Sequence, residues 1–271
     1  MLSKRYFSSR IPKTLKKDFL TVSQIIYPNQ EKLLAWASGV ALEDLRMKLK
    51  KKARDLPEFD WEKEKKQSAE AFKEAMKVRG SIGQEVHTFI GKILTTSTST
   101  NTTSSSNSII NYKEIKSKEV AHCVKAFENW YAQAPYKVIE VETEVHSEKN
   151  RFYGRADCFA LNTETNEVSV LDFKVKSNFL NFVNAMQCAA YALAYNEMRN
   201  LEPSSNKYCS TGIIIQIKYD EKKEKAAVVE RKVRDLQAAE VAFHCRNLLT
   251  RLESNPKDKN SFSDEWIFEA K

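Results

Sequence analysis

The chain has 271 residues, of which 42% are hydrophobic and 30% are charged, and its formal net charge is +8. This length can bury one good-sized core, and no stretch approaches the roughly 20 consecutive apolar residues that a membrane-spanning helix needs. The positive charge favours a polyanionic partner, with nucleic acid ahead of an anionic membrane surface.

The N-terminal segment is interpreted as a leader. Residues 1–17 (MLSKRYFSSRIPKTLKK) contain six Lys or Arg, three Ser and no acidic residue. They lack the continuous apolar region of a secretory signal, and their composition is typical of a mitochondrial transit peptide. We therefore expect residues 1–20 to direct the protein to the mitochondrial matrix. The alternative is a basic tail that contacts phosphates.

Hydrophobic periodicity predicts helices first, then strands, then a mixture of both. Apolar residues recur every three or four positions over 21–55, 59–94 and 117–133, which predicts helices. Residues 95–108 (TTSTSTNTTSSSNS) contain no apolar residue, so we expect a disordered loop insertion there. After residue 136 the period changes to two, which predicts strands at 137–146, 151–161 and 167–175. A helix at 179–199, a strand at 212–219 and a last helix at 228–253 are predicted to follow.

This order of elements predicts a mixed α/β (α+β) protein. The first three strands form an antiparallel meander, and helices flank a small central mixed sheet. An N-terminal helical part precedes the sheet. We expect one domain over residues 21–255, followed by a C-terminal tail at 256–271.

Several common sites are excluded by the motifs that the sequence lacks. It has six glycines but no dinucleotide-binding, P-loop or nucleophile-elbow pattern. Its five cysteines include no C-x-x-C pair, which argues against a zinc ribbon and a disulfide framework. An iron–sulfur cluster would require four scattered cysteines to converge in space. Carboxylates, a lysine and a histidine remain as the candidates for chemistry.

The strand 168–174 (VSVLDFK) ends in an acid and a base. Asp172 and Lys174 are two residues apart, so both project from the same face of the strand, about 7 Å apart. Similar acid-x-Lys triplets elsewhere lie in charge-rich stretches and are interpreted as solvated surface. Asp172 differs because it follows a buried-type strand, where an unpartnered charge is costly. The pair is either a surface salt bridge or part of an active site.

The preceding strand supplies a second acid in a similar setting. Asp157 interrupts the apolar segment YGRADCFAL, and a short hairpin can bring it close to Asp172. Two adjacent carboxylates repel each other unless a cation lies between them, and hard oxygen ligands suit Mg²⁺ or Mn²⁺. Lys174 could orient or deprotonate a water. Glu142 or Glu144 could provide a further ligand or hold that water.

Two helical pairs accompany these strands. Gly83 and His87 are four residues apart, so they share a helix face, where the glycine permits a close approach and the imidazole can bind metal. Gln187 and Tyr191 have the same spacing on the helix after Lys174 and suit contact with a phosphate or a base. For each pair taken alone, ordinary packing is the stronger interpretation.

The order of these motifs resembles the RecB-type branch of the PD-(D/E)XK nucleases, and within it the mitochondrial genome-maintenance exonucleases. The order is G-x-x-x-H on a helix, Glu on a strand, G-x-x-D, D-x-K, and Q-x-x-x-Y on a helix. The resemblance runs from residues 21–27 (TVSQIIY) to the last helix and implies a restriction-endonuclease-like core. The proline of the family's name is absent, because Arg155 and Ala156 precede Asp157, a change common in this branch.

The resemblance also implies roles for individual residues. Lys174 corresponds to the catalytic lysine, Glu142 to the family's acidic position, and Gln187 with Tyr191 to substrate-positioning residues, with Gly83 on the substrate side. The implied metal ligands are His87, Asp157 and Asp172, together with the carbonyl of Phe173. The clustered cysteines of the family's iron–sulfur exonucleases are missing here, so no such cluster is expected.

The function implied by the resemblance is Mg²⁺- or Mn²⁺-dependent hydrolysis of single-stranded DNA at free ends or flaps, in the maintenance of mitochondrial DNA. We expect a monomer that does not bind membranes. Two alternatives remain open. One is an endonuclease or RNase on the same fold, and the other is a catalytically silent module that binds nucleic acid.

Overall fold

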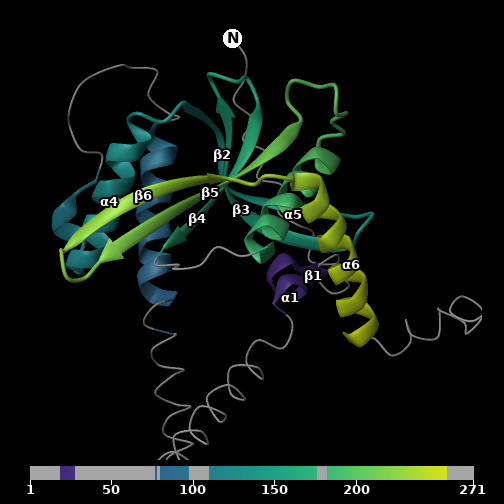
Figure 1. Cartoon of the computed structure of the whole chain (residues 1–271), viewed down its shortest axis with the longest axis horizontal. Helices are drawn as coiled ribbons and strands as arrows, with labels where there is room; N and C mark the ends of the chain where they lie inside the picture. The colour runs from purple at the N-terminus through teal and green to yellow at the C-terminus, as the bar shows by residue number, and fades with distance from the viewer. Residues whose placement is uncertain (1–18, 28–76, 78–79, 98–109, 176–181, 255–271) are drawn as a thin grey trace, which may run out of the picture. The chain divides into compact units, whose positions relative to one another are not determined.

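The computed structural model describes residues 19–27, 77, 80–97, 110–175 and 182–254 (Figure 1). The predicted leader and tail, most of the helices predicted at 21–55 and 59–94, and most of the predicted loop insertion lie outside these residues. The chain divides into two compact units, of which the first is Tyr27–Gln84 and the second is the remainder. The second unit contains the sheet.

The second unit is built on a mixed sheet of six strands, which confirms the predicted fold class. The sheet order is β1-β3-β4-β5-β6, and β2 pairs with β3. The strands are β1 Leu20–Thr21, β2 Tyr136–Ser147, β3 Phe152–Asn162, β4 Val168–Val175, β5 Cys209–Asp220 and β6 Lys225–Lys232. The helices are α1 Val22–Ile26, the short 3₁₀ helix η2 Tyr112–Glu114, α4 Lys118–Tyr131, α5 Phe182–Met198 and α6 Leu236–Ser254.

Strands β2, β3 and β4 form the predicted antiparallel meander. The chain then passes through α5 and returns as β5, which pairs in parallel with β4. Four of the alanines on α5 are buried, and such small side chains let a helix lie close to a sheet.

Two segments of at least three residues were assigned to the wrong kind of element. Residues 228–232 were assigned to the last helix, but they belong to β6, which pairs antiparallel with β5, and α6 begins at Leu236. The pattern was ambiguous because β6 is an edge strand with no fully buried residue, so its sequence lacks a clear apolar alternation. Residues 95–97 were assigned to the loop, but they extend the preceding helix, and their hydroxyls donate to carbonyls four residues earlier.

Helices cover both faces of the sheet (Figure 1). Neighbouring residues of a strand point to opposite faces, and β4 shows which helices lie where. The ring of Phe173 contacts Phe127 of α4, whereas the ammonium of Lys174 contacts Gln187 of α5. The helical residues 85–97 lie on the α4 side, because the His87 ring contacts Phe173.

Two pairs of aromatic side chains pack in the core on the α5 side. Phe159 of β3 packs on Tyr195 of α5 with ring centroids 4.1 Å apart, and Phe152 packs on Phe243 of α6 at 4.8 Å. Burial of side chains of this size contributes about 2 to 3 kcal/mol each. In the part of the chain that the structure describes, no helix has the length and apolar character needed to cross a membrane.

Candidate active site

The site lies where β3 and β4 separate. Their pairing runs from Leu161 opposite Val168 to Cys158 opposite Leu171, and it ends just before Asp157 and Asp172. Beyond that point a side chain connects the strands, because the backbone N–H of Phe173 donates to Asp157 Oδ2 at 2.8 Å. The predicted hairpin therefore brings the two aspartates to the point at which the sheet opens.

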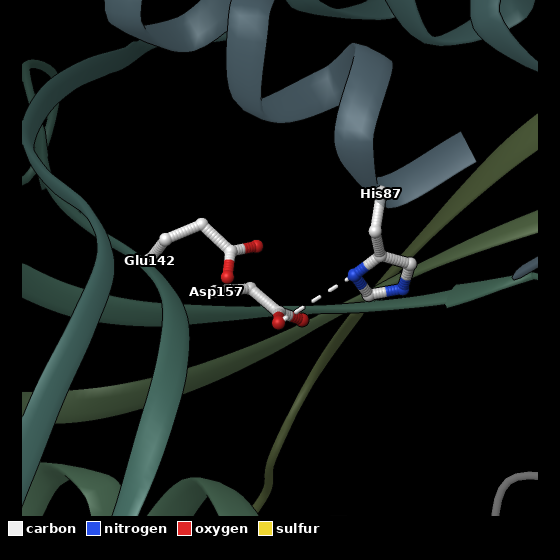
Figure 2. Close-up of side chains that lie close together, drawn as sticks. All are labelled: His87, Glu142 and Asp157. Carbon is white, nitrogen blue, oxygen red and sulfur yellow. Dashed lines mark ion pairs between the residues drawn. The ribbon is translucent and has the colours of Figure 1, made fainter. Parts of the chain in front are cut away.

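His87, Glu142 and Asp157 form a group that could hold a metal ion (Figure 2). One ligand atom from each lies within 4.8 Å of the others, and the residues come from the helix at 80–97, from β2 and from β3. His87 Nδ1 is 3.5 Å from Asp157 Oδ1. Two carboxylates and an imidazole are a donor set that suits Mn²⁺ and, through the oxygens, Mg²⁺.

Glu142 joins this group from a position opposite Asp157, and its backbone there is unusual. Its φ is 50°, in the left-handed region, although it lies inside β2. Among the described residues, the four other non-glycine residues with positive φ all lie between elements. The β2–β3 pairing correspondingly passes from Val141 to Thr143 and omits Glu142. A left-handed residue costs about 1 to 2 kcal/mol, and such strain clusters at functional sites.

Packing and charge hold His87 in place. Its ring meets the edge of Phe173 with centroids 6.0 Å apart, and Phe173 is held in turn by Phe127 of α4 at 5.4 Å. Burial lowers the pKa of His87, but the hydrogen bond and the negative charge of Asp157 outweigh burial, so the pKa is raised. Phe173 therefore contributes its ring and its backbone N–H, while its carbonyl as a metal ligand stays a prediction.

Lys174 is held by partners on two elements. Its Nζ lies 2.7 Å from Asp172 Oδ2 and donates to Gln187 Oε1 at 3.0 Å. Burial lowers the pKa of Lys174, but the charges of Asp172 and Asp157 outweigh burial and raise it. Lys174 is therefore an ammonium ion at neutral pH. Of the two predicted possibilities, orienting a water fits this charge better than deprotonating it.

Asp172 lies outside the group of three and is almost completely buried. The pKa of Asp172 is raised to about 6, because burial, together with the charge of Asp157, outweighs the lowering effect of Lys174. Although Oδ2 is close to Lys174 Nζ, it has no partner in hydrogen-bonding geometry within the described part of the chain. The cation that faces this buried oxygen is the Lys174 ammonium, so metal ligation by Asp172 stays a prediction.

Gln187 and Tyr191 are connected to Lys174. Gln187 accepts from Lys174 and donates through Nε2 to the Tyr191 hydroxyl at 3.0 Å. Tyr191 is only 5% exposed. Direct contact of this pair with substrate stays a prediction. The hydrogen bonds show that Gln187 and Tyr191 also position Lys174.

The glycines of the two predicted motifs differ in their surroundings. A Cβ on Gly154 would lie 2.7 Å from Cε1 of Tyr191 and 3.0 Å from Cγ2 of Val22, so a glycine is needed for Tyr191 to pack there. A Cβ on Gly83 would meet no atom within 4 Å. Gly83 lies on the same helix as His87, and its proposed substrate contact stays a prediction.

Arg155 is a residue of the site that the sequence motifs do not predict. Arg155 Nε lies 2.9 Å from Glu142 Oε2, so the acid of the metal group already has a cationic partner. The sequence offered one signal, a basic residue two positions before Asp157 and therefore on the same strand face. Glu144, the alternative to Glu142, pairs with Arg155 through the sheet register and is not part of the group of three.

Comparison with known families agrees with this geometry. The model of the PD-(D/E)XK nuclease superfamily matches residues 59–261. Because the match covers most of the chain and the fold is consistent with that of these enzymes, the chain belongs to the PD-(D/E)XK nuclease superfamily. Its members are generally metal-dependent nucleases, so membership implies a nucleic-acid substrate and a divalent metal ion as cofactor. A search of curated proteins finds no match to the chain.

Proposed function

We propose that this protein is an Mg²⁺- or Mn²⁺-dependent exonuclease that hydrolyses single-stranded DNA at free ends or flaps. The observation that carries the nuclease part is the meeting of His87, Glu142 and Asp157 beside the Asp172–Lys174 pair. The order of the five motifs supports placement in the RecB-type branch, close to the mitochondrial genome-maintenance exonucleases. The basic, acid-free N-terminus supports action in the mitochondrial matrix on mitochondrial DNA.

Each residue has a definite part in the proposed reaction. His87, Glu142 and Asp157 would hold the metal, with Asp172 and the Phe173 carbonyl as the further ligands that the resemblance implies. A bound divalent cation polarises the phosphoryl oxygen and lowers the pKa of a bound water. The Lys174 ammonium, oriented by Asp172 and Gln187, stabilises the negative charge that develops on the attacked phosphate. Contacts to the backbone carry no base information, so sequence preference is slight.

Digestion of end-labelled DNA tests the proposal. Linear single strands, covalently closed single-stranded circles and linear RNA are each incubated with the full chain in Mg²⁺ or in EDTA. The proposal predicts Mg²⁺-dependent shortening of the linear DNA and an intact circle. A linearised circle would identify an endonuclease, cleavage of the RNA alone would identify an RNase, and binding without cleavage would identify a silent module.

Substitution of Lys174 tests the catalytic assignment. We expect Lys174→Ala to cleave DNA about 100-fold more slowly or worse, because removal of one group that stabilises the transition state has this effect in other enzymes. The variant should bind DNA nearly as the wild type does. Lys222→Ala is the matched control, because Lys222 follows Asp220 at the same spacing but is exposed in the turn after β5. Normal cleavage by Lys174→Ala would remove Lys174 from the mechanism.

A further inference from the structure

Arg155 lies at the edge of the metal group without a role in the reaction described above. Its side chain is 66% exposed, and it contacts Glu142, which is 37% exposed. It comes two residues before Asp157 on β3, so the two side chains leave the same face of the strand. A cation therefore lies beside the metal ligands, on their solvent side.

Most of the hydrogen-bonding capacity of Arg155 is unused. A guanidinium group has five N–H donors, of which one is on Nε. Glu142 is the only partner of Arg155 among the described residues, and it is contacted through Nε. The four donors on the two Nη atoms remain available in a planar arrangement that matches a phosphate group.

The strength of the attraction between Arg155 and Glu142 depends on whether a metal ion is bound. Without a metal, Glu142 and Asp157 carry two adjacent negative charges, and Arg155 offsets part of their repulsion. A divalent cation held by the same carboxylates offsets this charge by itself, so the attraction between Glu142 and Arg155 weakens. With the metal bound, the two carboxylates, the cation and Arg155 together carry a charge of +1, which suits a phosphodiester anion.

We propose that Arg155 is a substrate-positioning residue that exchanges partners, from the Glu142 carboxylate before metal binding to a phosphate of the bound DNA strand afterwards. This inference rests on the proposed function and assigns that site a phosphate-binding arginine. It makes two predictions of opposite sign: Arg155 competes with the metal for Glu142, and it strengthens binding of the strand once the metal is present.

Two binding measurements test the exchange. Free Mn²⁺ is followed by electron paramagnetic resonance as it is added to the metal-free full chain, and Arg155→Ala is expected to bind Mn²⁺ about twofold to fivefold more tightly. Binding of a labelled linear oligodeoxynucleotide is then measured in EDTA and in Mn²⁺, with Lys174→Ala present in every protein so that the strand stays intact. Arg155→Ala should weaken binding roughly threefold to tenfold in Mn²⁺ and change it little in EDTA.

Control variants separate the exchange from simpler effects. Arg155→Lys keeps the charge but loses the planar donors, so we expect Mn²⁺ affinity near that of wild type and intermediate strand binding. Arg231→Ala removes an exposed arginine from the edge strand β6 and should alter neither measurement. Thermal unfolding of each variant checks that the fold is kept.

The inference is overturned if Arg155→Ala weakens strand binding equally in EDTA and in Mn²⁺, which is the behaviour of an ordinary surface charge. It is also overturned if Arg155→Ala binds Mn²⁺ no more tightly than wild type, or if the wild-type chain binds no Mn²⁺. Neither measurement requires cleavage. A chain that shows the exchange but leaves linear DNA uncut would refute the proposed exonuclease and retain the role of Arg155.

Discussion

Glu142 and Glu144 lie two residues apart on β2, yet only Glu142 joins His87 and Asp157. The sheet register separates them, because Glu142 lies opposite Asp157, between the pairs Val141–Cys158 and Thr143–Ala156, whereas Glu144 pairs with Arg155. Glu142 also has a φ of 50°, a conformation that Glu144 does not share. Periodicity alone would give both glutamates the same face of a regular strand. The left-handed backbone at Glu142 breaks that regularity, and the Glu142 carboxylate lies close to the side chains of Asp157 and His87 (Figure 2).

Replacing Glu142 with glycine should therefore make the metal-free protein more stable and the metal site weaker. Glycine adopts a positive φ without a Cβ clash, and relief of about 1 kcal/mol raises the melting temperature by about 2 to 4 °C in a protein of this size. The exposed ion pair with Arg155 that is lost contributes little. The measurement is thermal unfolding by circular dichroism in EDTA, followed by Mn²⁺ titration.

Glu144→Gly is the matched control for this prediction. Glycine at a regular strand position lowers the free energy of unfolding by about 0.5 to 1 kcal/mol. The melting temperature of Glu144→Gly should therefore fall, while its Mn²⁺ affinity is kept. Equal destabilisation by both substitutions would show that the backbone at Glu142 is not strained.

At the scale of elements, α5 links the two strands that carry the aspartates. Tyr191 packs over Gly154 of β3, and its hydroxyl accepts from Gln187, which holds Lys174 of β4. The helix thus determines where the lysine lies relative to Asp157. A change in packing at Gly154 should therefore alter the position of Lys174.

Gly154→Ala should lower both stability and cleavage. The added methyl would lie 2.7 Å from the Tyr191 ring, and overpacking of this kind costs about 1 to 3 kcal/mol. Displacement of Tyr191 loosens the hydrogen bonds to Lys174, so the cleavage rate at saturating DNA should fall more than DNA affinity. Thermal unfolding and cleavage kinetics at several DNA concentrations measure the two effects.

Gly80→Ala is the control for this substitution. Its added Cβ would meet no atom within 4 Å, and alanine favours a helix by up to about 1 kcal/mol over glycine. Wild-type stability and activity of Gly154→Ala would contradict the assigned contact between Tyr191 and β3.

At the scale of the whole molecule, burial separates the five cysteines. Cys123, Cys158, Cys188 and Cys209 are buried, and Cys245 is exposed. Burial raises the pKa of Cys123 to about 11 and that of Cys209 to about 12, and it raises the pKa of Cys158 and Cys188 as well. Raised pKa values leave less of the reactive thiolate at a given pH.

The native chain should therefore react quickly at one thiol with a disulfide reagent at pH 8, and at all five after denaturation. The pKa values predict that the four buried thiols stay slow as the pH rises to 9, since thiolate forms only near the raised pKa. Cys245→Ser should remove the fast phase. A second fast thiol in the native protein would contradict the described packing.

The sequence predicted the parts of the fold whose pattern reflects burial. Strands β2, β3 and β4 have the alternation or apolar character of half-buried and buried strands, and Asp157 and Asp172 stood out as charges within them. Strand β6 was mistaken for helix because pairing with β5, rather than a buried face, determines its conformation. The backbone of Glu142, the ion pair of Arg155 and the contact of Tyr191 with Gly154 arise from tertiary structure and leave no periodic signal.

The central claim is that His87, Glu142 and Asp157 bind the divalent cation that Lys174 needs for DNA cleavage. The most direct test measures bound Mn²⁺ and the cleavage rate of a linear single strand together, as Mn²⁺ is added to metal-free wild type, Asp157→Asn and Lys174→Met. We predict that Asp157→Asn loses Mn²⁺ binding and cleavage together. Lys174→Met should bind Mn²⁺ normally and cleave DNA at least about 100-fold more slowly than the wild type. Cleavage by Asp157→Asn at the wild-type rate, or cleavage by wild type in EDTA, would contradict the account.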